Sequence, residues 1–183
     1  MHSRTIKSIV LVIATIALLI GCTPTFDEPL TTGSFQAVTG RDLRIVTGQT
    51  LYVPAYSEVL LGGRDQTHEL VVTLAVHNTD LNAPIILQSV RYHDTDGDLV
   101  RSYVTDPIEV SALATTGFLV EAQDTTGGWG SNFIVEWVAE EPVSEPIVEA
   151  IMVSRSGSQG ISLISLGRVI AQNDAESDIS TEE

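Results

Sequence analysis

The stretch Glu69-Leu-Val-Val-Thr-Leu-Ala-Val-His77 decides the fold class of this 183-residue chain. Leu70, Val72, Leu74 and Val76 recur at every second position, so an extended chain places all four on one face. The opposite face begins with Glu69 and ends with His77. We therefore predict a β-strand here, with one face toward a hydrophobic core.

Similar short apolar stretches follow along the chain, and turn-forming residues separate them. After the N-terminal leader, no stretch shows an apolar period of about 3.6 residues, which a helix would need. The pattern predicts an all-β domain over residues 48–171, an antiparallel immunoglobulin-like β-sandwich. The chain lacks a Cys…Trp…Cys core, which excludes an antibody-type domain. The other predicted strands are 50–57, 84–93, 99–104, 108–110, 115–122, 132–139, 147–153 and 160–170.

Alternation within these stretches also predicts which side chains are buried. Pro54 lies inside the first of them, which favours an edge strand or a bulge because proline cannot donate to the ladder. The expected core residues of the later strands are Ile86, Val90, Tyr92, Phe118, Val120, Phe133, Val135, Trp137, Val148, Ala150 and Met152.

The N-terminus resembles a bacterial lipoprotein leader. Arg4 and Lys7 precede a twelve-residue apolar run, Ile9 to Ile20, which is short for a membrane span and typical of a cleaved signal. The run ends in Leu19-Ile20-Gly21-Cys22, the pattern of a lipobox. We predict a signal peptide over residues 1–21 and lipidation, including palmitate, at Cys22. The alternatives are an uncleaved N-terminal anchor, or a secretory signal with a chance cysteine.

The segments that flank the predicted domain differ from it in composition. Residues 22–47 are rich in Thr, Pro and Gly and read as a flexible tether. Residues 172–183 are polar and acidic and predict a disordered tail. Thr23, where aspartate would favour retention in the inner membrane, favours the periplasmic face of the outer membrane. The expected location is therefore the bacterial cell envelope.

The charge of the chain restricts its partners. Removing residues 1–21 leaves 7 basic against 24 acidic residues, a difference of −17. Phosphate backbones repel such a chain, so nucleic-acid binding is excluded. A single cysteine also excludes an internal disulfide and any multi-cysteine metal site.

The segment Asp94-Thr95-Asp96-Gly97-Asp98 has two interpretations. Its alternating carboxylates are hard oxygen ligands that suit calcium. A full calcium loop needs a glutamate six positions after Gly97, and Tyr103 stands there. Asp96-Gly97 is also a strong hairpin dipeptide. We therefore favour a turn between two strands, and we expect no cofactor.

Two histidines suggest a weaker metal hypothesis. His77 and His93 both point outward by strand parity, and they would approach one another if their strands paired. Two imidazoles and Asp94 could then hold a transition metal. No spacing enforces this arrangement, so the site is unlikely from the sequence alone.

The most unusual stretch of the chain is Gly127-Gly128-Trp129-Gly130-Ser131-Asn132. Glycine permits a positive φ and close backbone approach, and Trp129 at a loop tip would offer an apolar platform. One interpretation is a wide turn whose tryptophan folds back over the end of the sandwich. The other is a binding loop for a ligand or a partner.

Nucleophilic catalysis has little support. The chain has no G-x-S-x-G elbow, and its serines fall in predicted turns. Only a dispersed Ser-His-Asp arrangement would give a hydrolase, so we expect no enzymatic activity.

Four stretches in combination resemble a known family: Gln49–Ser57, Arg91–Tyr103, Asp124–Trp137 and Gln159–Arg168. They are similar to a bacterial family called domain of unknown function 3124, whose members often carry lipoprotein leaders. The resemblance covers Gln49 to Ile170 and implies no activity, substrate or catalytic residue. The family's turn has an uncharged residue near Asp96 and a basic one near Asp98, a difference that weakens the calcium interpretation further.

These patterns together favour a lipid-anchored envelope protein with a non-enzymatic binding or structural role, held to the membrane by its anchor and contacting an envelope protein. The alternative is a periplasmic protein that binds a metal or a small ligand.

Overall fold

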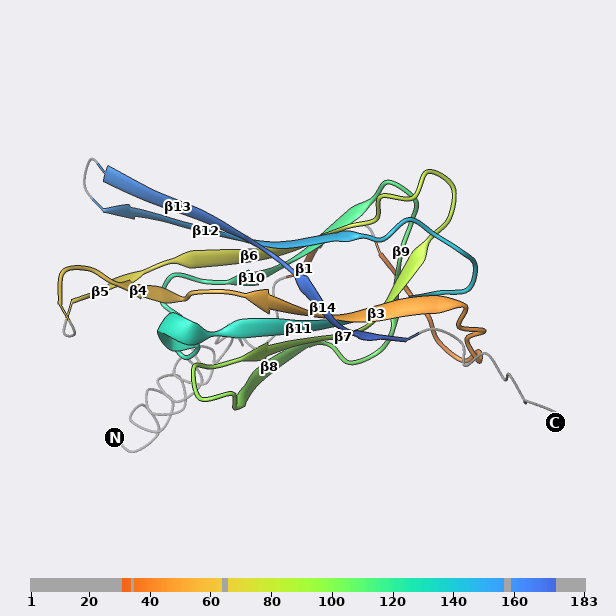
Figure 1. Ribbon diagram of the computed structural model, residues 1–183, viewed down its shortest axis with the longest axis horizontal. Helices are drawn as coiled ribbons and strands as arrows, with labels where there is room; N and C mark the ends of the chain where they lie inside the picture. Colours follow the sequence, from red (N-terminus) through yellow and green to blue (C-terminus); the bar gives the residue numbers. More distant parts are fainter. Residues whose placement is uncertain (1–30, 34, 64–65, 157–158, 174–183) are drawn as a thin grey trace, which may run out of the picture.

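The computed structural model describes residues 31–33, 35–63, 66–156 and 159–173. They form a β-sandwich of two antiparallel sheets packed face to face (Figure 1). The predicted signal peptide, Cys22 and the residues beyond Asn173 in the predicted tail lie outside the described residues. Among the described residues no helix has the length and hydrophobicity needed to cross a bilayer.

One sheet has five strands in the order β1-β10-β6-β12-β13. The second has seven, in the order β14-β3-β11-β7-β9-β2, with β8 paired to β7, and β4 and β5 form a separate hairpin. The strands are β1 (Thr31–Gly33), β2 (Gln36–Ala37), β3 (Thr47–Pro54), β4 (Glu58–Leu60), β5 (Thr67–Glu69), β6 (Val71–His77), β7 (Ile85–His93), β8 (Leu99–Val104), β9 (Ile108–Val110), β10 (Thr115–Val120), β11 (Asn132–Ala139), β12 (Ile147–Ser156), β13 (Gln159–Leu166) and β14 (Arg168–Gln172).

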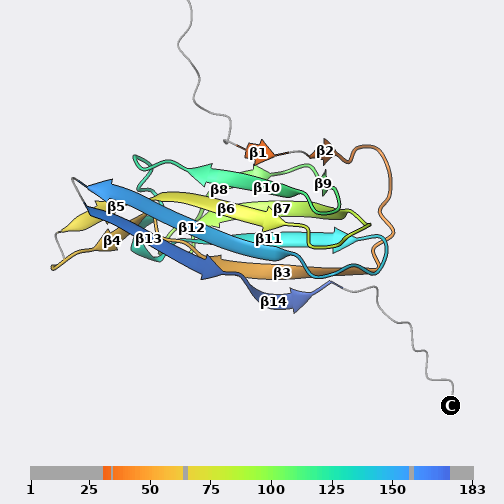
Figure 2. The same ribbon diagram turned by 90° about the horizontal axis from the view of Figure 1, so that it is seen from above.

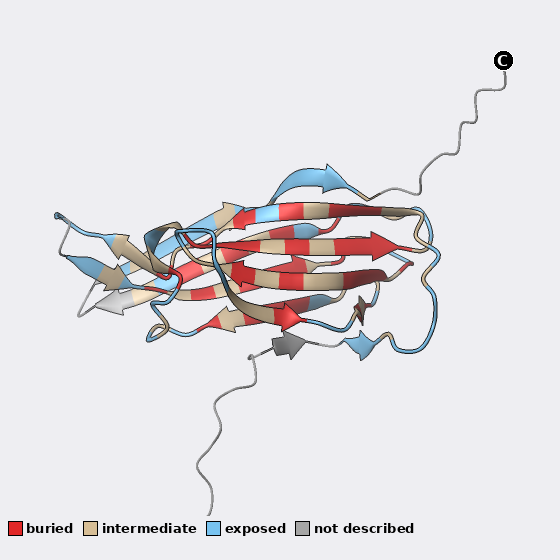
Figure 3. Ribbon diagram, turned by 90° about the horizontal axis from the view of Figure 1, so that it is seen from below, coloured by how far each residue is buried: buried red, intermediate tan, exposed pale blue. Residues whose placement is uncertain are grey.

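The core lies between the two sheets and confirms most of the alternation argument. Leu70, Val72, Leu74 and Val76 are fully buried, as predicted. Buried residues alternate with half-buried ones along the long strands (Figure 3). The predicted inward residues of β10, β11 and β12 also belong to this core.

Ile86 is buried, as predicted, but it does not point toward the core between the sheets. The pairing of β7 with β11 shifts between Glu136 and Trp137, whose partners are Ser89 and Leu87, so Gln88 is an extra residue on β7. Such a bulge reverses the alternation. The inward residues are therefore Ile85 and Leu87 before the bulge, and Val90 and Tyr92 after it. Ile86 is buried on the outer side of its sheet, opposite Val138.

The edge-strand prediction for the strand with Pro54 was also wrong. β3 lies between β14 and β11, inside its sheet. Pro54 is the last residue of β3, and the pairing with β14 runs only from Gln49 to Tyr52. The missing N–H therefore removes no hydrogen bond from that ladder.

The predicted closing strand 160–170 is two strands in two sheets. β13 ends the five-stranded sheet and β14 begins the other, with Gly167 alone between them. A Cβ at Gly167 would lie 3.1 Å from the carbonyl oxygen of Val148 and 3.2 Å from side-chain atoms of Leu51 and Val53. The chain crosses between the sheets where only glycine fits comfortably.

Part of the predicted tether pairs with the sandwich. β1 pairs with β10, and β2 pairs with β9. These short strands extend one edge of each sheet, so the described part of residues 22–47 is not a free linker throughout.

Asp80 joins two connections at the end of the sandwich opposite Trp129. Its carboxylate accepts hydrogen bonds from the backbone N–H groups of Asn82, Ala83 and Ser144, all at 2.9 Å. These bonds, that of Asn82 foremost, lower the pKa of Asp80 below its ordinary value.

Candidate functional site

Three connections meet at one end of the sandwich and form what we call the loop end: residues 55–57 between β3 and β4, the turn 94–98, and the β10–β11 loop 121–131. The 3₁₀ helix η1 (Gly128–Gly130) marks this end at the left of Figure 1. It contains the predicted binding loop, so we describe it residue by residue.

The turn 94–98 is a hairpin, as predicted. Asp94 accepts backbone hydrogen bonds on Oδ1 from Asp96 at 3.0 Å and from Asp98 at 2.9 Å, and Gly97 has a φ of 90°. The carboxylate of Asp94 therefore satisfies its own turn rather than standing free for a cation. Within the described ranges no cluster of three or more His, Cys, Asp or Glu side chains has the geometry of a metal site.

His77 and His93 do not come together. β6 carries His77 in the five-stranded sheet, and β7 carries His93 in the other, so the strand pairing that the metal hypothesis required does not form. The Nδ1 atom of His77 hydrogen-bonds with Thr115 Oγ1 at 2.9 Å, and its Nε2 lies 3.6 Å from Glu149 Oε1.

The glycines of the β10–β11 loop are required by close contacts. A Cβ at Gly127 would lie 1.8 Å from the hydroxyl oxygen of Tyr92 and 2.7 Å from Ser131 Cβ. Gly128 has a φ of 71°, which favours glycine. The loop and the hairpin turn are tied together because Thr95 donates to the Gly127 carbonyl through both its N–H and its hydroxyl, each at 3.0 Å.

A buried chain of hydroxyl groups fixes the inner side of the loop. The Tyr92 hydroxyl donates to Ser131 Oγ at 3.0 Å, and Ser131 Oγ donates to the Ala55 carbonyl at 2.8 Å. Ser57 donates to the Gly128 carbonyl through its hydroxyl at 3.1 Å. Burial raises the pKa of Tyr92, and its hydrogen bonds with Ser131 and Ser57 offset only part of that rise.

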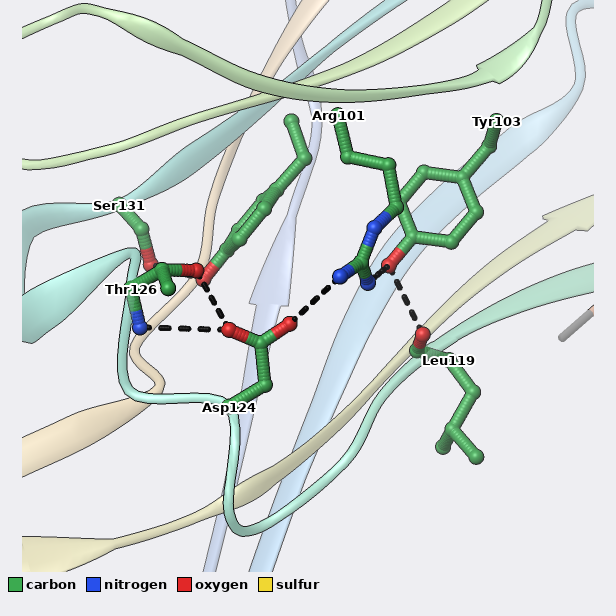
Figure 4. A network of polar contacts seen from close by, with 7 residues as sticks. Arg101, Tyr103, Leu119, Asp124, Thr126 and Ser131 are labelled. Atoms are coloured by element: carbon green, nitrogen blue, oxygen red, sulfur yellow. Dashed lines mark hydrogen bonds and ion pairs between the residues drawn. The ribbon is translucent and has the colours of Figure 1, made fainter. Parts of the chain in front are cut away.

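A second polar network joins the loop to β8 (Figure 4). Arg101 Nη2 lies 3.0 Å from Asp124 Oδ2, and Asp124 Oδ1 accepts hydrogen bonds from the N–H and hydroxyl of Thr126. Tyr103 donates to the Leu119 carbonyl at 2.8 Å and accepts from Arg101 at 3.2 Å.

The network also shifts two pKa values. Burial raises the pKa of Tyr103. Burial lowers the pKa of Arg101, but its hydrogen bond to Tyr103 and the charge of Asp124 raise that pKa overall. Arg101 on β8 therefore stays charged and binds the β10–β11 loop through Asp124.

The six residues of the predicted binding loop differ in how far they are buried. Gly127, Ser131 and Asn132 are buried, and Gly128 and Gly130 are half-buried. Trp129 is 56% exposed, so it does not fold back over the end of the sandwich. β4 contacts η1, and Leu60 at the end of β4 and Leu61 after it are exposed apolar side chains.

Two of the stretches that suggested a family therefore contact one another: Arg101 on β8 pairs with Asp124 in the β10–β11 loop, and Tyr92 on β7 hydrogen-bonds with Ser131 of the same loop. The profile of the family described as "Protein of unknown function (DUF3124)" matches residues 48–170. The chain belongs to the DUF3124 family. No curated protein and no solved structure matches it. In this DUF3124 chain the matched span begins in β3 and ends in β14, so it includes the strands of both sheets except β1 and β2.

A groove of about 400 Å³ in this DUF3124 chain contains a pair that the sequence analysis did not find. His68 on β5 lies with its Nε2 atom 2.7 Å from Ser154 Oγ on β12, and Glu69, Ala122 and Val153 also line the groove. The imidazole can accept the serine proton, which is the first requirement for a nucleophilic serine. Within the described part of the chain no carboxylate hydrogen-bonds to His68, so the third member of a triad is missing. The two residues are 86 positions apart, and no sequence motif links them.

Proposed function

We propose that this DUF3124 protein is a lipid-anchored protein of the bacterial cell envelope that binds another envelope protein, without catalysis, through its loop end. The observation that carries the binding proposal is Trp129, a 56% exposed aromatic side chain on a loop whose backbone is held by Thr95, Ser57 and the Tyr92–Ser131 pair. A rigid exposed aromatic residue loses little entropy on binding, and such residues anchor many interfaces.

The lipid anchor is supported by the sequence. A twelve-residue apolar run ends at Gly21-Cys22, and Cys22 is the only cysteine in the chain. Thioether and amide acyl chains on that cysteine would hold the protein stably, since each buried methylene contributes about 0.8 kcal/mol. The eight residues 23–30 then separate the anchor from β1.

The chemistry of the partner follows from the surroundings of Trp129. Leu60 on β4, the strand that contacts η1, and Leu61 after it are exposed, and Asp96, Asp98 and Glu121 are exposed on the turn 94–98 and the β10–β11 loop. The matching surface is an apolar pocket with a basic rim, because opposite charges at a rim steer association and exclude wrong partners. A nucleic acid or an anionic lipid surface would be repelled.

Two measurements test the two parts of the proposal. For the anchor, cells are labelled with a palmitate analogue, and the wild type is compared with Cys22→Ser. Label that depends on Cys22, with a shorter mature chain, supports it. Equal label or an unprocessed wild-type chain overturns it.

For the binding surface, a photo-crosslinking amino acid replaces Trp129 in intact cells, and the matched control carries it at the exposed Leu81. One discrete crosslinked envelope protein from position 129, absent from position 81, supports the proposal. No crosslink, or the same products from both positions, contradicts it.

A second candidate function rests on the pair His68–Ser154, whose 2.7 Å contact in an open groove suits a serine hydrolase. A fluorophosphonate probe tests it, because only an activated serine reacts. Labelling of the wild type that is lost in Ser154→Ala and in His68→Gln would support hydrolysis. Absence of label in the correctly folded wild type removes this candidate.

A further inference from the structure

The last strand of the five-stranded sheet has a free edge. In the described part of the chain, β13 pairs with β12 alone, and Figure 2 shows it outermost beside β12. Its eight residues, Gln159-Gly-Ile-Ser-Leu-Ile-Ser-Leu166, include neither a charge nor a proline. Soluble proteins usually protect such an edge with lysine, proline or a bulge, because unpaired N–H and C=O groups attract another strand.

The outward side of β13 is also apolar. Register with β12 places Ile161, Leu163 and Ser165 toward the core side, and Ser162, Ile164 and Leu166 on the outer face. Ile164 is 64% exposed and Leu166 63%. A strand with one face in water normally alternates apolar with polar, whereas a strand covered on both faces does not.

The apolar surface continues onto the neighbouring strands. Among the described residues, seven of the fifteen exposed large apolar side chains fall on β12, β13 and β14. Besides the β13 residues, these are Ile147 and Val153 on β12, and Val169 and Ile170 on β14. Concentration at one edge of the molecule indicates an interface, since exposed apolar residues are otherwise scattered.

We propose that the free edge of β13 pairs antiparallel with β13 of a second copy of this chain, joining two five-stranded sheets into one. A two-fold axis makes the contact self-complementary, so each hydrogen bond and each apolar contact occurs twice. The contact goes beyond the proposed binding at the loop end and does not rest on it.

The absence of charge on β13 makes this edge a place where a second copy can bind. The full chain has a net charge of −15, so most pairs of its surfaces would repel one another. The β13 strand brings no charge to the contact, so two copies can approach there without like charges facing across the new ladder. A basic partner would find no carboxylate on this strand to pair with, and would be drawn to other surfaces.

The test uses the full chain purified from envelopes in detergent, with its mass measured by light scattering across a dilution series. Ile164→Lys puts one lysine on each of the two β13 strands that would pair, so two like charges would meet in the dimer. The dissociation constant of the dimer should rise at least about tenfold. Leu81→Lys is the matched control, because Leu81 is 72% exposed and lies outside β13, in the connection between β6 and β7. Thermal unfolding verifies that both variants fold.

A second measurement does not depend on a destabilising change. Single cysteines replace Ser162, Leu163, Ile164 and Ser165 in turn, because in a two-fold antiparallel pair one position faces its own copy. A disulfide-linked dimer at one or two neighbouring positions, absent from Leu81→Cys, supports the pairing and gives its register.

Each result decides the proposal. A dimer for the wild type and Leu81→Lys with a monomer for Ile164→Lys supports it. A monomer at every wild-type concentration overturns it, as does a dimer that Ile164→Lys leaves unchanged. A different protein that copurifies with the wild type and is lost in Ile164→Lys overturns the second copy as occupant.

Discussion

Replacing Gly127 with alanine tests whether contacts with the core fix the loop end. The new Cβ would lie 1.8 Å from Tyr92 Oη, 2.5 Å from Tyr92 Cζ and 2.7 Å from Ser131 Cβ. Tyr92 is fully buried and packs on Phe133 with ring centroids 4.9 Å apart, so its ring has little room to retreat. The backbone at residue 127 has a φ of −75°, so alanine adds crowding without dihedral strain.

Three contributions set the size of the effect. Overpacking costs about 1–3 kcal/mol. Displacing the Tyr92 hydroxyl from Ser131 loses roughly 1 kcal/mol. The lower entropy of the unfolded alanine chain offsets about 0.4–1 kcal/mol. We expect the free energy of unfolding to fall by about 2 kcal/mol.

Urea denaturation followed by tryptophan fluorescence measures this change, and acrylamide quenching of Trp129 in the native state reports whether the loop has moved. Gly63→Ala is the matched control, because no atom lies within 4 Å of its added Cβ. We expect the control to remain within about 0.5 kcal/mol of the wild type. A Gly127→Ala protein as stable as Gly63→Ala, with unchanged quenching, would refute the reasoning.

Three further predictions concern the charged and titrating groups. A double-mutant cycle of Arg101→Met and Asp124→Asn should give a coupling energy of about 0.5–1 kcal/mol in urea denaturation, because Arg101 is 38% exposed and solvent screens the pair. A coupling energy near zero would show that the ion pair does not hold the loop. The pKa values of Tyr92 and Tyr103 are raised in the folded state, so their contribution to stability is complete below their unfolded pKa of about 10 and is lost as pH rises above it. Urea denaturation should therefore show that the free energy of unfolding falls from pH 8 to pH 11, and that it falls less in Tyr92→Phe than in the wild type. An equal fall in both proteins would contradict this prediction. The pKa of Asp80 is lowered by folding, so its contribution is present above pH 3.8 and is lost as pH falls further. The stability difference between the wild type and Asp80→Asn should narrow from pH 7 to pH 3, and a constant difference would contradict the role of its backbone hydrogen bonds.

The sequence predicted the strands well where alternation is regular. Leu70 to Val76 gave the correct inward face, and the turn at Asp96-Gly97 was found because that dipeptide has a specific backbone preference. Alternation failed at Gln88, because a bulge depends on the pairing with β11 and leaves no local signal. The pattern also predicted one strand where the structure has β13 and β14, because contacts with distant strands determine the crossing at Gly167.

The candidate site was predicted only in part. The glycine-rich loop was found because its composition is unusual, but its division into buried Gly127 and exposed Trp129 depends on Tyr92, which lies 35 positions earlier. The ion pair of Arg101 with Asp124 and the contact of His68 with Ser154 were missed. Both join residues that only the completed sandwich brings together.

The order of strands links the proposed anchor to the proposed dimer. β1 and β13 are the two edges of the five-stranded sheet, so four spacings of about 4.8 Å, roughly 19 Å, separate them. Because the segment that carries the proposed anchor enters the sheet at β1, the edge opposite β13, pairing of β13 with a second copy does not compete with it.

The symmetry of the dimer then restricts its orientation. The two-fold axis of an antiparallel strand pair runs perpendicular to the sheet. The two copies meet the same bilayer in equivalent orientations only if this axis is also perpendicular to the membrane. The joined sheets must then lie parallel to the bilayer, with one face of the sandwich toward it. In this orientation Trp129 extends sideways from the end of the strands, where a neighbouring envelope protein can reach it without displacing either anchor.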